Sequence, residues 1–250
     1  MSTTVYIGHA VGDEHGNARG GEPGNQTGKE LRISPWYLNK KGWRVLRALD
    51  PVVRMRLAED MRKACNNPMI GYDQSQRNTL WTAVLPHNFD CALVDKPVEC
   101  DCSSLVRVCL AYAGVRVDNF NTESEAKRLL ATGKFEELTG DQYTKQSAYL
   151  CEGDILVTCT KGHTCVVLNN GDKADPEPVP PPIPTEQKVL VLGGRVHIRS
   201  GDSTDYPVLA TAKKGDMYPY VQTAPSGWYE IVFRSSTAFI SNKPTLTRLV

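Results

Sequence analysis

The sequence predicts an α+β domain over residues 1–171, a proline-rich linker over 172–186 and a small all-β domain over 187–250. Three observations support this division. Helical spacing alternates with β-branched runs in the first part of the chain, whereas the last part holds only short β-branched runs separated by turn residues. Between them, "DKADPEPVPPPIPTE" favours an extended polyproline conformation. A chain of 250 residues is long enough for two domains.

The N-terminal region predicts short strands joined by turns. "TVYIGHA" and "KELRISPWYL" are apolar enough for strands, and "GDEHGNARGGEPGNQTG" between them consists mainly of turn-forming residues. A helix is then expected from Pro51, with Asp50 as its cap, until Asn66-Asn67-Pro68 ends it. The apolar residues with helical spacing in this segment are Val53, Leu57, Met61 and Ala64.

Two further helices are expected in the first domain. Thr122 and Glu125 have the spacing of a capping box and predict a helix that ends at Gly133. In "ECDCSSLVRVCLAYAG" (residues 99–114), an apolar helical period begins just after Cys102 and ends at Gly114. The helix N-terminus therefore lies at Cys102, where unpaired N–H groups and the helix dipole are expected to lower the pKa of a thiol. We expect Cys102 to be a nucleophile.

A thiolate nucleophile also needs a base within hydrogen-bond reach. In "EGDILVTCTKGHTCVVLNNG" (residues 152–171), the pattern predicts a strand from Ile155, a tight Lys-Gly turn and a second strand that begins at His163. Such a hairpin holds the imidazole rigidly at its rim. His163 is therefore the predicted base.

These two motifs resemble those of the NlpC-type branch of papain-like cysteine peptidases and amidases, which cut bacterial peptidoglycan. The family motifs D-C-S-[GS]-L-V and G-D-I…G-H correspond here to "DCSSLV" and "GDI…GH" within residues 70–171. The resemblance implies a papain-like fold, Cys102 as the nucleophile, His163 as the base, and no metal or cofactor. The alternatives are a buried structural thiol, or zinc binding by Cys91, Cys100 and Cys102, although no second Cys-x-x-Cys or His-x3-His spacing completes a zinc set.

The resemblance also implies a third polar residue that orients the base from the strand after it. That strand is missing here, because Asn170-Gly171 leads into the linker. Our sharper hypothesis is that "VYIGHA" supplies the strand from the N-terminus, as in a circular permutation, with His9 in the third position. Asn169 or Asn170 is the alternative, in which case His9 is an ordinary strand or loop residue.

Four more residues are candidates for substrate binding. Tyr72 matches a tyrosine that lines the groove in the family, although a core tyrosine explains it equally well. Asp101 caps the helix, contacts substrate, or does both. Ser103 and Cys102 offer backbone N–H groups for an oxyanion hole. Gln26 lies in a loop expected to wall the cleft, unless that loop is simply solvated.

The C-terminal segment resembles bacterial SH3-type domains. "VHIRSGDSTDYPVL…KKGD…GWYEIVF…TAFISN" follows their V-N-V-R-S-G-P-S-T-x-Y…K-G…G-W-Y-K-I…G-Y-V pattern, with His197, Asp202 and Ala238-Phe239 as departures. The resemblance implies a barrel that tethers a hydrolase to the cell wall. Tyr206, Tyr218, Tyr220 and Trp228 offer flat surfaces for glycan or peptide.

Together these features predict a phage-endolysin-like peptidoglycan hydrolase that acts as a monomer. A formal net charge of +1 gives no reason to expect nucleic acid or an anionic membrane as a partner, and no apolar run of about 18 residues is present. The N-terminus lacks a secretory signal pattern, so we expect synthesis in the bacterial host cytoplasm, mostly free cysteines, and action at the wall after release. The rivals are a cysteine acyltransferase and a non-catalytic wall-binding protein; the bond that is cut stays open.

Overall fold

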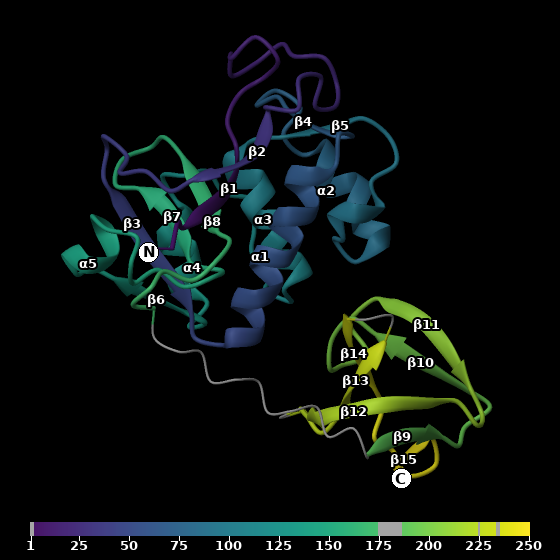
Figure 1. Ribbon diagram of the computed structural model, residues 1–250. Coiled ribbons are helices and arrows are strands. Elements are labelled where there is room, and N and C mark those ends of the chain that lie inside the picture. Colours follow the sequence, from purple (N-terminus) through teal and green to yellow (C-terminus); the bar gives the residue numbers. More distant parts are fainter. Residues whose placement is uncertain (1–2, 175–186, 225, 234–235) are drawn as a thin grey trace. The chain divides into compact units, whose positions relative to one another are not determined.

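The computed structural model describes residues 3–174, 187–224, 226–233 and 236–250 (Figure 1). Most of the predicted linker, residues 175–186, lies outside the described residues. The chain divides into two compact units, residues 1–176 and 177–250. Within the described residues, no helix combines the length and the apolar character needed to cross a membrane.

The first unit is built on a six-stranded antiparallel sheet with the order β2-β1-β8-β7-β3-β6. These strands are β1 (Tyr6–Ala10), β2 (Leu31–Pro35), β3 (Trp43–Ala48), β6 (Phe135–Leu138), β7 (Ile155–Thr158) and β8 (Thr164–Val167). A separate parallel pair consists of β4 (Ile70–Tyr72) and β5 (Val98–Cys100). The helices are α1 (Pro51–Asn66), α2 (Thr79–Val84), α3 (Cys102–Tyr112), α4 (Glu125–Ala131) and α5 (Asp141–Thr144), with 3-10 turns at Leu85–His87 and Cys91–Leu93.

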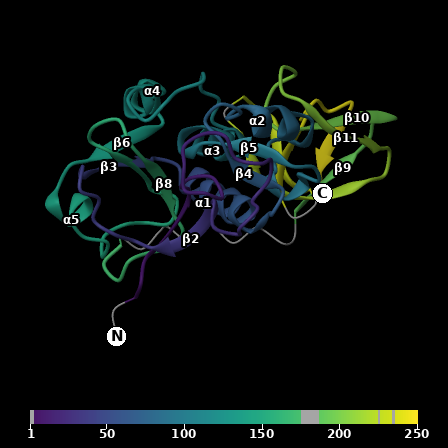
Figure 2. The same ribbon diagram turned by 90° about the horizontal axis from the view of Figure 1, so that it is seen from above.

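The predicted helix after Asp50 is confirmed as α1. The Asp50 side chain accepts the Val52 N–H at 2.8 Å, which satisfies a free donor of the first turn. The predicted apolar positions are all buried: Val53, Leu57, Met61 and Ala64. These residues belong to the larger of two apolar cores of this unit. Helix α1 lies against α3 and against the sheet (Figure 2). This packing fixes the start of α3 against the sheet.

The N-terminal strand β1 lies between β2 and β8, antiparallel to both, as the sequence predicted for a strand supplied from the front of the chain. Asn169 holds it there: its Oδ1 accepts the Tyr6 N–H at 2.7 Å and its Nδ2 donates to the Thr4 carbonyl at 3.0 Å. Gly8 lets β1 approach α1 closely, because an added Cβ would meet the Met61 side chain. The strand therefore has a fixed position beside β8.

The predicted capping box of Thr122 and Glu125 is wrong. The N-cap of α4 is Ser124, and no side chain caps this end. Thr122 instead accepts the Gly162 N–H at 3.0 Å, while Glu125 accepts the hydroxyl of Thr164 at 2.8 Å. Both side chains bind the β7–β8 hairpin because the helix start packs against it, and tertiary contacts replace the local cap.

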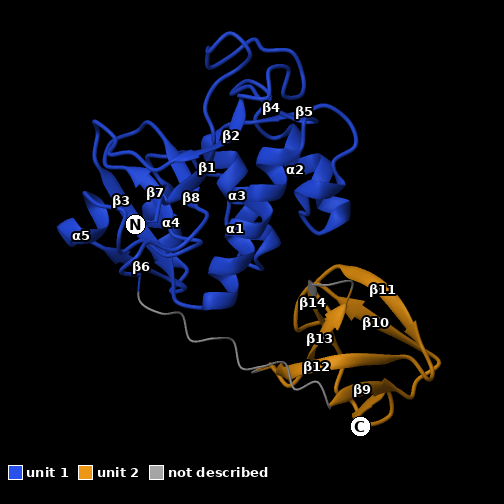
Figure 3. Cartoon of the chain, viewed as in Figure 1, with its two compact units in different colours: residues 1–176 blue, residues 177–250 orange. Residues whose placement is uncertain are grey.

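The second unit is rich in β-structure (Figure 3). Its strands are β9 (Lys188–Val191), β10 (Arg195–Arg199), β11 (Val208–Lys213), β12 (Met217–Thr223), β13 (Tyr229–Phe233), β14 (Ser236–Ile240) and β15 (Thr247–Leu249). The order β11-β10-β14-β13-β12-β9-β15 is open, since no pairing joins β11 to β15 among the described residues. The strands enclose their own apolar core, but the closed barrel that we expected is not confirmed.

Candidate active site

Cys102 is the first residue of α3, and the residue before it caps the helix. The carboxylate of Asp101 accepts the Ser104 N–H at 2.7 Å, and the Ser104 hydroxyl accepts the Asp101 N–H at 2.8 Å. This reciprocal pair satisfies two backbone donors and fixes the backbone on both sides of the cysteine. The helix therefore presents Cys102 in a defined orientation.

Arg77 holds the capping carboxylate from the other side. Its Nε and Nη2 donate to the two oxygens of Asp101 at 2.6 and 3.1 Å, and its Nη2 also donates to the Ser103 hydroxyl at 2.8 Å. The side chains of Asp101 and Ser103 are thus engaged in hydrogen bonds at the helix start and with Arg77. Of the two predicted roles for Asp101, capping is the one that the structure displays.

The thiol of Cys102 is nearly enclosed, with 7 % of the residue exposed. Burial, together with the charges of Asp101 and Glu125, raises its pKa to about 12, although hydrogen bonds from the N–H groups of Thr164 and Ser103 act in the opposite direction. The expectation that the helix N-terminus lowers this pKa is therefore wrong, because loss of water and two acidic neighbours outweigh the dipole. The resting sulfur is a neutral thiol.

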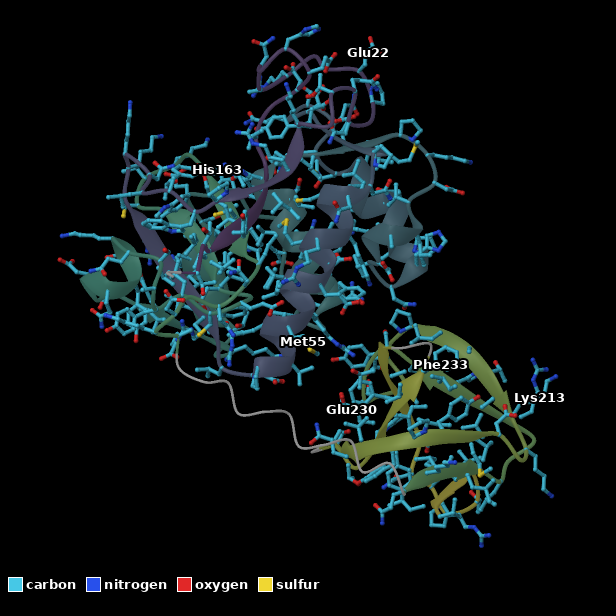
Figure 4. All side chains as sticks on the ribbon, viewed as in Figure 1. Glu22, Met55, His163, Lys213, Glu230 and Phe233 are labelled. Atoms are coloured by element: carbon cyan, nitrogen blue, oxygen red, sulfur yellow. The ribbon has the colours of Figure 1, made fainter. Side chains whose placement is uncertain are left out.

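His163 lies at the end of the β7–β8 turn (Figure 4). It directly precedes Thr164, whose N–H donates to the sulfur of Cys102. Its backbone is fixed by Thr158, whose N–H donates to the His163 carbonyl and whose hydroxyl accepts the His163 N–H, both at 2.9 Å. The Nε2 atom of its ring lies 2.8 Å from Nδ1 of His9. On the far side of His9, Nε2 lies 3.0 Å from the Ser34 hydroxyl.

The Ser34–His9–His163 chain is largely buried and lies near the positive charge of Arg32. Burial lowers the pKa of His163 to about 4, with a smaller contribution from the charge of Arg32. Burial also lowers the pKa of His9 to about 3, reinforced by His163 and Arg32. Both imidazoles are therefore neutral at pH 7, and each has one nitrogen to donate and one to accept.

Two aromatic rings pack around the histidine pair. The ring of Tyr37 lies 6.5 Å from that of His9, and the ring of Trp43 lies 6.4 Å from that of His163. The two aromatic rings also contact each other edge to face at 5.8 Å. Trp43 is buried, whereas Tyr37 is exposed at 39 %.

Glu125 is a buried acid next to the site that the sequence did not point to. Its Oε1 accepts the Thr164 hydroxyl, its Oε2 has no hydrogen-bond partner among the described residues, and the residue is fully buried. Burial raises its pKa to about 8, so it is largely protonated at pH 7. The sequence did not indicate a buried acid here, because Glu125 also has the spacing of a capping box with Thr122.

A pocket of about 440 Å³ opens beside the histidine pair. It is lined by residues of β1 and β2, their flanking segments and His163, namely His9, Val11, Arg32, Ser34, Pro35, Tyr37 and His163. The contributions of Arg32, Ser34 and Tyr37 were not predicted. The alternation of "LRIS" places Arg32 and Ser34 on one face of a strand, but the sequence does not show which strand pairs with it.

The other predicted site residues lie in different surroundings. Tyr72 is buried, and its hydroxyl accepts from Gln74 at 3.1 Å; burial and the nearby Cys102 raise its pKa, to about 12. Gln26 donates to the Pro23 carbonyl at 2.8 Å within its own loop and does not line the pocket at the histidines. Asn169, the alternative third residue, uses its amide to hold β1.

The cysteines are all free, as expected from the sequence. Cys102, Cys91 and Cys100 are buried, and Cys159 is exposed. Within residues 3–174 and the described parts of the second unit, no group of three or more His, Cys, Asp or Glu side chains is arranged to hold a metal ion.

The first unit is thus a mixed α/β domain with a cysteine, two histidines and a pocket at one end of an antiparallel sheet. A comparison with protein families shows the family to which this domain belongs. The model of the Endolysin-like domain family matches residues 7–174, which is more than half of the chain, and the chain belongs to this family. It is an endolysin-type hydrolase that acts on the bacterial cell wall, with peptidoglycan as its substrate. No curated protein matches the sequence.

Proposed function

We propose that this hydrolase cleaves an amide bond of peptidoglycan through a cysteine acyl-enzyme, with Cys102 as the nucleophile and His163 as the base. The observation that supports this best is the position of His163 directly before Thr164, whose N–H donates to the sulfur of Cys102. The Nε2 atom of the His163 ring lies 2.8 Å from Nδ1 of His9. This is the nucleophile, base and orienting group of covalent catalysis.

The mechanism requires one of the two tautomer arrangements that neutral imidazoles allow. In it, His163 donates its Nε2–H to Nδ1 of His9, and His9 donates its Nε2–H to the Ser34 hydroxyl. Nδ1 of His163 is then the free acceptor, and it takes the thiol proton as the sulfur attacks the amide carbonyl. Proton transfer accompanies attack, since thiol and imidazole are both uncharged beforehand.

Turnover follows from the same groups. The C–S bond forms, the C–N bond breaks, and His163 returns its proton to the departing amine. Water then attacks the thioester with His163 again as the base, which releases a carboxylic acid and restores the thiol. Backbone N–H groups in the first turn of α3, at Cys102 and Ser103, are proposed to stabilise the oxygen that becomes negative; the N–H of Ser103 contacts the sulfur in the resting enzyme.

The papain-like, NlpC-type assignment of the catalytic domain is part of this proposal. It is supported by the helix that begins at the cysteine, the adjacent antiparallel sheet and the histidine at a hairpin end. The third residue of such a site is proposed to be His9, carried on β1 in place of a later strand.

A matched pair of cysteine variants tests the mechanism. Cys102→Ala is expected to reduce the lysis of purified sacculi by at least about 1,000-fold, since it removes the nucleophile itself. Cys159→Ala removes an exposed thiol and is expected to lyse sacculi at the wild-type rate. Equal lysis by wild type and Cys102→Ala contradicts the mechanism and favours a wall-binding protein.

Mass spectrometry of the released fragments separates the remaining alternatives. Hydrolysis gives new free amine and carboxyl ends, and their masses identify the bond as a muramoyl–alanine, stem-peptide or cross-bridge amide. Incorporation of an added amine at the new carboxyl end instead indicates acyl transfer.

We also propose that the second unit is an SH3-like wall-binding module. Tyr206, Tyr218, Tyr220 and Trp228 are half-buried, so each keeps an accessible ring edge or face. A chain ending at residue 174 is expected to cleave soluble muropeptides at the full rate but to clear sacculi more slowly, because tethering raises the local enzyme concentration. Equal rates on sacculi contradict a binding role.

A further inference from the structure

Arg32 is a cation at the rim of the pocket beside the histidines. It faces His9 directly across β1 and β2, so the two side chains lie on the same face of the sheet. Arg32 is exposed, and its charge is near enough to contribute to the lowered pKa of His9 and His163 and to oppose in part the rise that burial causes in the pKa of Tyr37. Its positive charge therefore makes the electrostatic potential in the pocket beside the two imidazoles more positive.

The guanidinium of Arg32 has no hydrogen bond or ion pair within the described part of the chain, and no acidic side chain lines its pocket. Other arginines of this unit are paired with carboxylates: Arg44 with Glu137, Arg47 with Asp154, Arg62 with Glu152 and Arg77 with Asp101. Arg32 is thus charged, exposed and available to an anion from outside.

We propose that Arg32 binds a carboxylate of the peptidoglycan stem peptide, on the portion that leaves as the new amine. This inference rests on the proposed function. His163 gives its proton to the departing amine, so the amine side of the scissile bond must lie beside the imidazole. The pocket that Arg32 lines is also lined by His163, and we place the departing portion there. Stem peptides carry free carboxylates near their amide bonds.

The chemistry of the pocket fits such a group. A guanidinium presents a planar set of donors that matches the two oxygens of a carboxylate, and this charge-assisted pairing fixes orientation as well as adding affinity. The Ser34 and Tyr37 side chains line the same pocket and give its wall a polar and an aromatic part. Arg32 therefore selects substrates by charge, next to the atoms that react.

The test compares two substrates and three variants. Soluble muropeptides from digested sacculi are used as prepared, and also after their carboxyl groups are converted to amides. Release of new amine is measured as kcat/KM for wild type, Arg32→Gln and Arg32→Lys. Lys127→Gln is the matched control, since it removes one exposed positive charge on α4 outside the pocket.

Wild type and Lys127→Gln are expected to favour the carboxylate substrate by about 10- to 100-fold, the size of a charged hydrogen-bonded contact. Arg32→Gln is expected to lose this preference by slowing only on the carboxylate form, and Arg32→Lys to keep part of it. If wild type treats both substrates alike, or Arg32→Gln slows equally on both, carboxylate binding is excluded. The latter result would mean that Arg32 acts only through the pKa of the histidines.

The cysteine variants keep this inference separate from the proposed function. If Cys102→Ala abolishes amine release but Arg32→Gln leaves the substrate preference intact, only the role of Arg32 fails. If Cys102→Ala still releases amine at the wild-type rate, the proposed mechanism fails first.

Discussion

The Nδ1 atom of His9 lies 2.8 Å from the Nε2 atom of His163, although 154 positions separate the two residues in the chain. They meet because β1 and β8 are neighbours in the sheet, with Gly8 opposite Val166. The Asn169 amide fixes the start of β1, and the Ser34 hydroxyl contacts the far side of the His9 ring. A strand from the N-terminus thus orients the proposed base.

Replacing His9 tests this orienting role. His9→Ala is expected to lower kcat on soluble muropeptides by about 100-fold, because a misaligned base costs a factor of this order, while KM changes little. His9→Asn retains a polar partner for His163 and is expected to recover part of kcat. His15→Ala, in an exposed loop, is the control. A wild-type kcat for a folded His9→Ala protein, checked by thermal melting, contradicts the prediction.

The acid limit of activity tests the electrostatics of the site. The pKa of His163 is lowered to about 4, so the imidazole stays a neutral base until the pH falls close to that value. The acid limb of kcat/KM is therefore expected to have its midpoint well below the usual histidine pKa of about 6.5. Arg32→Gln removes a positive neighbour and is expected to move this midpoint upward. A wild-type midpoint at 6.5 or above contradicts the burial argument.

Glu125 is expected to make stability depend on pH. Its pKa is raised to about 8 in the folded state, so folding takes up a proton once the pH exceeds the unfolded value, and stability falls as the pH rises from about 4.5 to 8. Glu125→Gln copies the neutral acid and removes a cost on the order of 3 kcal/mol at pH 7.

Thermal melting at two pH values checks this effect. The variant is expected to melt several degrees above wild type at pH 8, and close to it at pH 4.5, where the wild-type carboxyl is protonated in both states. A difference in melting temperature that is the same at both pH values shows that Glu125 does not titrate on folding.

Arg77 is expected to stabilise the helix that carries Cys102. Arg77→Met leaves the Asp101 carboxylate largely buried without its partner, and the free energy of unfolding is expected to fall by about 3 kcal/mol. The control is Arg44→Met, since the Arg44–Glu137 pair is more exposed and such pairs contribute about 1 kcal/mol or less. Denaturant unfolding measures both. Equal losses would show that the burial of Asp101 is not decisive.

The sequence was most informative where local signals and chemistry coincide. Asp50 and Pro51 begin α1, and Asp101 and Ser104 begin α3, because caps depend on neighbours in the chain. The central strand β3 was not predicted, since its apolar residues show no clear strand alternation. The closed C-terminal barrel was expected from a motif and is not confirmed by the strand order.

The functional site shows the same difference between local signals, which could be predicted, and contacts across the fold, which could not. Cys102, His163 and His9 belong to recognisable motifs, and the structure brings the two histidines into contact. The raised pKa of Cys102 depends on burial, and the availability of Arg32 depends on strand register, so neither is readable from adjacent residues. Glu125 was misread because the local pattern of a capping box competes with a contact across the fold.

The place of β1 in the sheet has a consequence for how the protein is made. His9 precedes His163 by 154 positions, so it leaves the ribosome well before His163 and the neighbouring strand β8 are synthesised. A nascent or prematurely terminated chain therefore lacks an oriented base. Hydrolytic competence arises as a late event of biogenesis, when the two ends of the catalytic domain come together.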